Sequence, residues 1–280
     1  MKTDYSFVRY LSAKKTVDDR ALNQHVWRAM AEALPERARI LEIGAGIGTM
    51  VERFAKNGLL DGAVYTAVDN QPDNIITARQ RLQHLNKNVH LETIDLFDFI
   101  RREQGKQTWD LLIAHAFLDL MDIPATLPPL FSLIEPGGHF YFTINFDGAT
   151  IFQPTIDPIL DDQIEQLYHR TMDERITDGK LSGDSRSGRH LFHQLRQAGG
   201  EILAAGSSDW VVFAETDGYP ADEAYFLQFI IHTMQQALNG HPGLGTAQFA
   251  DWIRQRQQQI ERGDLVYIAH QIDFLGRVPK

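Results

Sequence analysis

The feature that most constrains the fold of this chain is a glycine-rich bend that follows a short apolar run. The run covers residues 39–43, and Gly44, Gly46 and Gly48 follow at alternate positions. Glycine accepts the positive φ angles of a sharp bend and lets main chain come close to a ligand. A helix that begins behind such a bend favours a negative group at its N-terminus. The segment therefore predicts a strand, a bend and a helix, with a small-molecule site at the end of the strand.

Between residues 39 and 145, short apolar runs alternate with amphipathic helical stretches. The predicted strands are Arg39–Ile43, Ala63–Val68, Val89–Ile94, Trp109–Ala114 and Gly138–Ile144. The predicted helices between them begin near Gly48, Pro72, Phe97 and Ile123. Strand–helix alternation builds a parallel sheet with helices on both faces. The pattern therefore predicts an α/β fold with a doubly wound, mostly parallel sheet.

The residues before and after this core are predicted to be mainly helical. Thr16 and Asp19 fit a capping box for one helix over 17–34, which Pro35 ends, so residues 1–38 are expected to form an N-terminal helical cap. The later elements are expected to be a loop over Phe146–Leu160, a helix through Ile164 and Met172, a mobile stretch over Ile176–Ser187, a helix capped by Ser187, a strand over Ile202–Phe213, helices over Ala221–Leu238 and Thr246–Arg262, and a strand over Leu265–Leu275. Residues 39–280 are thus expected to form one core, in which helical insertions at about 146–187 and 218–262 form a lid.

Charge and cysteine content exclude several classes of protein. A net charge of −10 repels phosphate backbones, which argues against a nucleic-acid partner. The absence of cysteine excludes disulfides, thiolate zinc sites and cysteine nucleophiles. Met1–Lys15 lacks the apolar segment of a secretory signal, and no window reaches the ~18 apolar residues of a membrane span. We therefore expect a cytoplasmic protein without a membrane partner.

The densest apolar run, Ala224–Ile231, is apolar on most sides. Such a helix is expected to be buried under other elements. Two other interpretations stay open, namely a contact between the two copies of a homodimer and a wall of a hydrophobic acceptor pocket.

Four further segments accompany the glycine bend in a fixed order. They are Val68-Asp69-Asn70, Ile94-Asp95-Leu96, the run from Trp109 to Phe117, and the segment from Leu133 to Phe140 with its Pro136-Gly137-Gly138 turn. Glu42 to Gly48 read acidic–hydrophobic–G-x-G-x-G, whereas a dinucleotide fingerprint reads G-x-G-x-x-G. Over residues 39–145 these segments together resemble class I S-adenosylmethionine-dependent methyltransferases. The resemblance implies a methyl-transferring enzyme with a Rossmann-like fold and an antiparallel last strand, S-adenosylmethionine as cofactor and S-adenosylhomocysteine as product.

The resemblance also implies roles for residues around the cofactor. The expected contacts are Glu42, Gly44, Ala45, Gly46 and Gly48 with the methionine part, Asp69 and Asn70 with the ribose, Asp95 and Leu96 with the adenine, and His115 beside the cofactor. A carboxylate such as that of Asp69 can accept hydrogen bonds from both hydroxyls of a ribose. Dinucleotide-binding folds have an acid at the same place. Asp69 and Asp95 are also suited to cap the helices that follow them.

Methyl transfer from a sulfonium is an in-line displacement on a reactive donor, so the protein mainly aligns the reactants and excludes water. A base is needed only if the acceptor enters protonated, and the candidates are His115 and Asn145. Candidate substrate-binding residues are Tyr168, Arg186 and His190, of which the last two could reach an anionic substrate.

The expected acceptor is a small molecule, and its reacting atom stays open. The fourth strand lacks the Asn/Asp-Pro-Pro-Tyr/Phe sequence of amino-methylating DNA and glutamine enzymes. No metal site is expected, although Asp119, Asn145 and Asp147 could be assembled into one. Two rivals remain. One is a nicotinamide-dependent oxidoreductase, against which the glycine spacing and Asp95 count; the other is a non-catalytic S-adenosylmethionine-binding protein.

Overall fold

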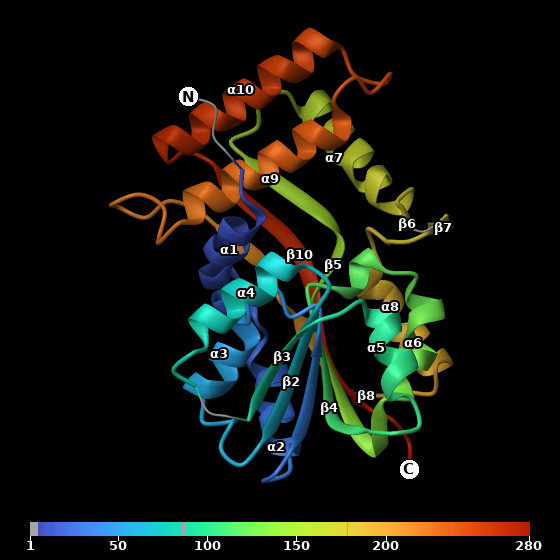
Figure 1. Cartoon of the computed structure of the whole chain (residues 1–280). Helices are drawn as coiled ribbons and strands as arrows, with labels where there is room; N and C mark the ends of the chain where they lie inside the picture. Colours follow the sequence, from blue (N-terminus) through green and yellow to red (C-terminus); the bar gives the residue numbers. More distant parts are fainter. Residues whose placement is uncertain (1–4, 86–87, 178) are drawn as a thin grey trace.

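The chain folds into alternating strands and helices (Figure 1), and the computed structural model describes residues 5–85, 88–177 and 179–280. The strands are β1 (Arg39–Ile43), β2 (Val64–Asp69), β3 (Val89–Thr93), β4 (Trp109–His115), β5 (Ile134–Gln153), β6 (Ile176–Thr177), β7 (Lys180–Leu181), β8 (Glu201–Ser207), β9 (Trp210–Val212) and β10 (Val266–Arg277). The helices are α1 (Phe7–Ala21), α2 (Gln24–Ala33), α3 (Thr49–Lys56), α4 (Pro72–Arg81), α5 (Leu96–Glu103), the 3-10 turn η1 (Leu118–Leu120), α6 (Ile123–Phe131), α7 (Pro158–Asp173), α8 (Ser187–Gln197), α9 (Glu223–Leu238) and α10 (Thr246–Arg262).

The central sheet has the strand order β3-β2-β1-β4-β5-β10-β8, and β9 also pairs with β10. The strands β3, β2, β1, β4 and β5 are parallel. Strand β10 runs antiparallel to β5, β8 and β9. The mostly parallel sheet with an antiparallel last strand is therefore confirmed. The run from Ile40 to Ile43 in β1 is buried throughout, as expected for a parallel strand covered on both faces.

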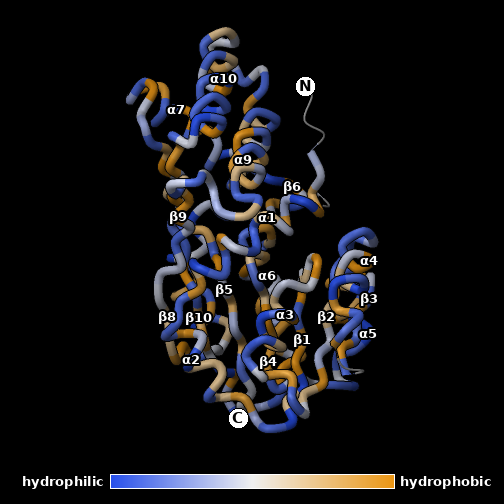
Figure 2. Tube along the Cα trace, turned by 90° about the vertical axis from the view of Figure 1, so that its left-hand side faces the viewer, coloured by the Kyte–Doolittle hydropathy of each residue, from blue (hydrophilic) through white to orange (hydrophobic). Residues whose placement is uncertain are grey.

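Two apolar clusters pack against the two faces of the sheet. One contains side chains of α1 to α4, α7, α9 and α10. The other contains side chains of α5, η1, α6 and α8. Figure 1 shows α1 to α4 on one side of the strands and α5, α6 and α8 on the other, and Figure 2 shows that hydrophobic segments concentrate along the strands. This arrangement leaves the carboxyl ends of β1, β2 and β4 facing α1 and the C-terminal helices.

The strand β5 is much longer than the sequence predicts. It continues beyond Ile144 to Gln153, and β10 pairs with it along this extension, with Gln271 opposite Phe146 and Val266 opposite Gln153. The predicted loop over Phe146–Leu160 is therefore wrong over its first half. The cause is non-local, because the backbone partner of these residues lies more than a hundred positions later in the chain. The extension carries α7, α9 and α10 at one end of the molecule (Figure 1).

The N-terminal segment forms two helices in place of the single predicted one over 17–34. Ser6 caps α1 by accepting a hydrogen bond from the amide of Arg9, and Asn23 caps α2 by accepting from two amides. Thr16 and Asp19 lie inside α1, so the predicted capping box is wrong. The chain breaks at Asn23 because the carboxylate of Asp273 on β10 accepts a hydrogen bond from its amide at 2.9 Å.

Three smaller differences concern the C-terminal half. Ile176 and Leu181 pair in the hairpin β6–β7, and Asp178 lies outside the described residues. Ser187 is the first residue of α8 and donates a hydrogen bond to the carbonyl of Phe146, so it is no cap. The predicted strand over Ile202–Phe213 is divided into β8 and β9. In the described part of the chain, no helix has the length and apolar character needed to cross a membrane.

Candidate functional site

A cavity of about 820 Å³ lies at the carboxyl ends of β1, β2 and β4. Its floor, called here the sheet half, is formed by the glycine bend and the residues that follow β2 and β4. Its cover, called here the lid half, is formed by α1, η1, the extension of β5, α7, α9, β9 and β10. Cavities of about 300–1,000 Å³ are typical of small-molecule sites. In a parallel α/β sheet a ligand is expected at this edge.

The glycine bend forms part of the cavity wall. Gly44 and Gly46 line it with φ angles of 62° and 54°. A Cβ atom at Gly44 would lie only 2.2 Å from Cδ2 of Phe117, so no larger residue fits there. Gly48 does not line the cavity; a Cβ there would lie 2.7 Å from Leu82 Cδ1, and its role is to pack α3 against α4.

Glu42 is a buried acid in the sheet half. It is 1% exposed, lines the cavity, and accepts a hydrogen bond from the Tyr65 hydroxyl at 2.9 Å. Burial raises the pKa of Glu42 to about 8, against the smaller opposing effects of Tyr65 and Arg53. The carboxyl therefore keeps its proton at neutral pH and would ionise next to a ligand cation.

The carboxylate of Asp69 braces the glycine bend. Its Oδ2 accepts from the Gly46 amide at 2.9 Å, and its Oδ1 accepts from the Gln71 amide at 2.9 Å and from the Asn74 amide nitrogen at 3.0 Å. A carboxylate offers about four acceptor positions. Three are therefore used, and Oδ2 keeps one for a ligand hydroxyl. The neighbouring Asn70 also lines the cavity.

His115, at the end of β4, is buried between the sheet and α1. Its Nδ1 lies 2.8 Å from the Thr143 hydroxyl, and its Nε2 lies 3.0 Å from Oδ2 of Asp18. Burial lowers the pKa of His115 to about 4, although Asp18 acts in the opposite direction. The imidazole is therefore neutral at physiological pH, and both ring nitrogens already have partners.

Asp18 connects α1 to the sheet half. It accepts hydrogen bonds from Lys14 Nζ at 2.7 Å and from Trp210 Nε1 at 2.9 Å, besides its contact with His115. Burial alone would raise the pKa of Asp18, but Lys14, His115 and Arg53 hold it well below its usual range. The sequence analysis missed Asp18. The four-residue spacing from Lys14 on one helix is the signal that could have identified the pair.

The backbone beside His115 is strained at two residues that line the cavity. Ala116 and Ile144 have φ angles of 50° and 56°. Left-handed φ angles at residues other than glycine cost of order 1–3 kcal/mol and are typical of ligand sites. The carboxylate of Asp273 holds Ile144 in place by accepting its amide hydrogen bond at 2.8 Å.

The lid half is mainly aromatic. Its aromatic walls are Phe7, Tyr10, Phe146, Tyr168, Trp210, Phe229 and Tyr267. The helix α9 buries most of the run Ala224–Ile231, while Phe229 and Ile230 also face the cavity. Two of the interpretations of this run, a buried helix and a wall of a pocket, are therefore compatible, because both describe α9. Tyr168, predicted to bind substrate, lies in this half.

The predicted adenine contacts lie outside this cavity. The carboxylate of Asp95 accepts from the amides of Phe97 and Asp98 at 2.8 and 3.2 Å and so caps α5. Leu96 packs in the second apolar cluster. The structure does not bring either residue to the lining formed by Glu42 and Asp69. Adenine binding by Asp95 and Leu96 stays a prediction.

Three further candidates also lie away from the cavity. The side-chain amide of Asn145 donates to the carbonyl of Ile272 at 2.8 Å. Arg186 is exposed, and the exposed His190 contacts Asp184 at 2.6 Å. None of the three lines the cavity. Within the described residues, no group of three or more acidic or histidine side chains could hold a metal ion.

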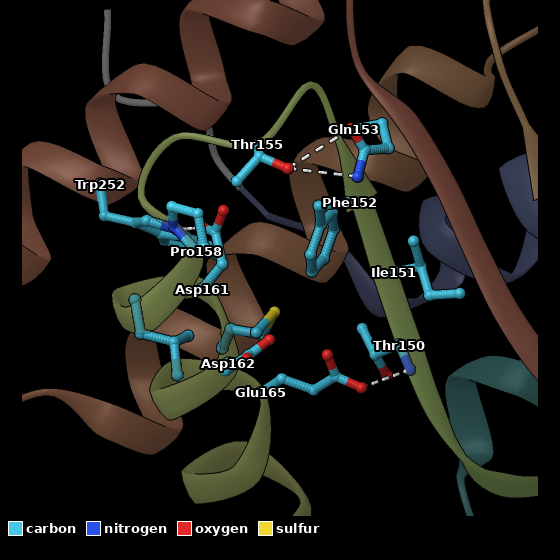
Figure 3. Close-up of a pocket in the computed structure, with 12 residues that line it drawn as sticks. Thr150, Ile151, Phe152, Gln153, Thr155, Pro158, Asp161, Asp162, Glu165 and Trp252 are labelled. Carbon is cyan, nitrogen blue, oxygen red and sulfur yellow. Dashed lines mark hydrogen bonds between the residues drawn. The ribbon is translucent and has the colours of Figure 1, made fainter.

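A second cavity of about 240 Å³ lies between the end of β5, α7 and Trp252 (Figure 3). Its acids hold the framework together. Asp161 accepts hydrogen bonds from Trp252 Nε1 at 2.5 Å and from Arg256 at 2.7 Å, and Glu165 accepts from the Thr150 amide at 2.9 Å. Thr150 lines both cavities, so the hydrogen bonds around this second cavity help to hold the β5 wall of the lid half in place.

Comparisons with known proteins agree with this architecture. Residues 41–140 match the family model described as a methyltransferase domain. Similar solved structures include an S-adenosylmethionine-dependent methyltransferase from Thiobacillus denitrificans in complex with S-adenosyl-L-homocysteine (TM-score 0.50, 12% identity, 98% of this chain and 99% of that chain covered). Another comes from Methanosarcina mazei (TM-score 0.50, 12% identity, 90% and 97% covered).

A third similar structure is phosphoethanolamine N-methyltransferase 2 from Haemonchus contortus, in complex with phosphomonomethylethanolamine and S-adenosylhomocysteine. Its TM-score is 0.51 at 13% identity, and 100% of this chain matches 59% of that chain. At such identities the likeness concerns the fold alone. No curated protein matches the sequence.

Proposed function

We propose, from the premise that this chain carries a class I methyltransferase domain with a Rossmann-like fold, that it transfers a methyl group from S-adenosylmethionine to a small-molecule acceptor. The observation that carries the proposal is the lining of the sheet half, where the glycine bend, Glu42 and one free acceptor position of Asp69 face one cavity. The cytoplasmic location, the separate N-terminal cap and a homodimer remain predictions from the sequence.

The residues present fit this cofactor chemically. The bend at Gly44 and Gly46 offers bare main chain, which a methionine moiety can approach closely. The Glu42 carboxyl can pair with an ammonium group, and Asp69 Oδ2 can accept from a ribose hydroxyl. When bound, the sulfonium supplies an activated methyl group. These contacts would hold it at the boundary between the sheet half and the lid half.

The chain's own contribution is to align the acceptor and to exclude water. The acceptor atom donates its electron pair to the methyl carbon while the carbon–sulfur bond breaks, and that bond's electrons stay on sulfur. Any proton on the acceptor atom is released to bulk solvent when the methylated product leaves the cavity. The neutral His115, held by Asp18 and Thr143, is a weak base at neutral pH, so we propose that it positions α1 over the cavity.

Calorimetric titration with S-adenosylhomocysteine and with NADH tests the proposal directly. We expect S-adenosylhomocysteine to bind at one site and NADH not to bind. Tight binding of NADH alone would support the oxidoreductase instead. Transfer of label from methyl-labelled S-adenosylmethionine to extract metabolites then distinguishes the enzyme from a non-catalytic binding protein.

The glycine bend gives a matched pair of variants. We expect Gly44→Ala to weaken S-adenosylhomocysteine binding by roughly tenfold or more, because its Cβ would displace Phe117 from the cavity wall. Gly58→Ala is the control, since Gly58 also has a positive φ of 70° but no atom within 4 Å of the added Cβ. Equal affinities of the two variants would argue against the bend as a binding element.

A further inference from the structure

The lid half contains a cation without an acidic partner. Two basic side chains, Lys14 and Arg175, line the cavity. Lys14 pairs with Asp18 at 2.7 Å, whereas no ion pair joins Arg175 to any carboxylate in the described part of the chain. The Nη1 atom of Arg175 is buried and makes no hydrogen bond there. Arg175 as a whole is half-buried, and a guanidinium that lines a cavity without a carboxylate partner can bind a ligand anion there.

The charges of Asp119 and Arg175 interact, but the two side chains form no ion pair in the described part of the chain. Asp119 lines the same wall, its Oδ1 is buried without a hydrogen-bond partner, and it makes no ion pair within 4 Å. Burial raises the pKa of Asp119 although the charge of Arg175 acts to lower it. Both side chains line the cavity; because Arg175 Nη1 and Asp119 Oδ1 are themselves buried, a ligand would contact the other polar atoms of these two groups.

The backbone keeps Arg175 and Asp119 on one wall. The Ser182 amide donates to the carbonyl of Arg175 at 2.8 Å, and the Asp184 amide donates to the carbonyl of Asp119 at 3.4 Å. Between them lies Gly183, where a Cβ atom would be 3.4 Å from Arg175 Nη1 and 3.3 Å from the Asp119 carbonyl. The strand β7 and its continuation thus join the end of α7 to η1.

The remaining walls suit a flat ring with oxygen substituents. Tyr10 stacks on Phe229 with ring centroids 4.2 Å apart and an interplanar angle of 19°. The hydroxyls of Tyr10, Tyr168 and Tyr267 have no hydrogen-bond partner among the described residues, and all three side chains line the cavity. Burial raises the pKa of Tyr168 to about 12, so its hydroxyl is a neutral donor.

We propose that the acceptor is a planar aromatic compound with a carboxylate, which Arg175 binds while the ring packs against the aromatic walls of the lid half. This inference rests on the proposed methyltransferase function. The single unpaired positive charge selects the carboxylate, and the aromatic surface selects the ring. The predicted anion contacts Arg186 and His190 are thus replaced by Arg175, which the sequence analysis missed.

Three compounds that share a phenol ring but differ in their charged groups test whether the lid half prefers a carboxylate. They are 3-(4-hydroxyphenyl)propanoate, L-tyrosine and tyramine, each titrated calorimetrically into protein saturated with S-adenosylhomocysteine. We expect the propanoate and tyrosine to bind roughly tenfold or more tightly than tyramine, which lacks the carboxylate. Tighter binding of tyramine, or no binding of either carboxylate, would overturn the proposal.

Variants of Arg175 test whether this residue binds the carboxylate. Arg175→Gln is expected to remove the preference for the carboxylates, and Arg175→Lys to retain part of it, with S-adenosylhomocysteine affinity unchanged in both. Arg170→Gln is the control, because Arg170 is an exposed arginine in the last turn of α7, just before Arg175. An unchanged preference in Arg175→Gln would contradict the assignment. Failure of the wild type to bind S-adenosylhomocysteine would instead refute the proposed function.

Discussion

The affinity of this protein for S-adenosylhomocysteine is expected to rise between pH 6 and pH 8, by up to about tenfold per pH unit, and Glu42→Gln is expected to abolish the rise. Burial raises the pKa of Glu42 to about 8, so the carboxyl is protonated below that pH. A ligand ammonium pairs best with the ionised carboxyl, which must then release its proton. Calorimetry in two buffers with different ionisation enthalpies measures both the affinity and the released proton.

The control for this experiment is Glu52→Gln. Glu52 lies on α3 behind the glycine bend, pairs with Arg81 at 2.8 Å, and does not line the cavity. This variant should keep the wild-type pH dependence. A wild-type affinity that does not change with pH, or an equal slope in Glu42→Gln, would show that Glu42 does not pair with the ligand.

Unfolding provides a second readout of the same group. The folded-state pKa of Glu42 lies above the ordinary value of 4.5, so the folded chain binds more protons between pH 4.5 and about 8. The contribution of Glu42 to the free energy of unfolding therefore falls as pH rises through this window, by about 5 kcal/mol at most. In urea unfolding, the free energy of unfolding of Glu42→Gln minus that of the wild type should therefore rise between pH 5 and pH 8.

The second large effect is expected from Asp18→Asn, which should lower the free energy of unfolding at pH 7 by about 3–5 kcal/mol. Asp18 is 2% exposed, and its removal leaves the ammonium of Lys14, itself 6% exposed, without a counter-charge. Lys14, His115 and Arg53 lower its pKa, so its contribution is present above the ordinary value of 3.8 and is lost as pH falls toward the folded-state value. Urea unfolding of the wild type and the variant at pH 7 measures the loss of stability, and the same comparison at pH 3 tests whether the difference between the two proteins becomes smaller.

The matched control is Asp222→Asn, which also removes a contact of α1. Asp222 pairs with Arg9 at 2.8 Å, but the two side chains are 44% and 54% exposed. Water screens such a pair, so the loss should be under about 1 kcal/mol. If the two variants lost equal stability, the buried contacts of Asp18 would not be what fastens α1 over the cavity.

Local sequence patterns predicted the core well because each pattern is completed within a few residues. The helix α4 begins at Pro72 and α6 at Ile123, as expected, and the strand before Gly44 has its predicted limits. The same locality explains why Glu42 and Asp69, singled out by their positions at strand ends, both line the cavity; their contacts with a cofactor stay predictions. Asp95 shows the limit of such reasoning, because a helix cap and a ligand contact have the same local pattern.

Errors arose where a distant partner decides the structure. The extension of β5 needs β10, and the break before α2 needs Asp273, which lies 250 residues from Asn23. The acceptor contacts expected in the lid half differ for the same reason, since Arg186 and His190 do not line the cavity and Arg175 does. Arg175 stands in an ordinary polar stretch of the sequence, and only the backbone bonds around Gly183 bring it beside Asp119.

The sequence by itself determined the alternation of strands and helices over residues 39–145, the glycine bend and the acids at the strand ends, since these depend on neighbours along the chain. Only the tertiary structure decided which of these acids share a cavity and how the lid closes over it. The physical reason is that burial and pairing, as between Asp18 and Trp210 at 192 residues' separation, depend on which segments pack together. Packing also sets the pKa of Glu42 and leaves Arg175 unpaired, and these two properties define what the cavity can bind.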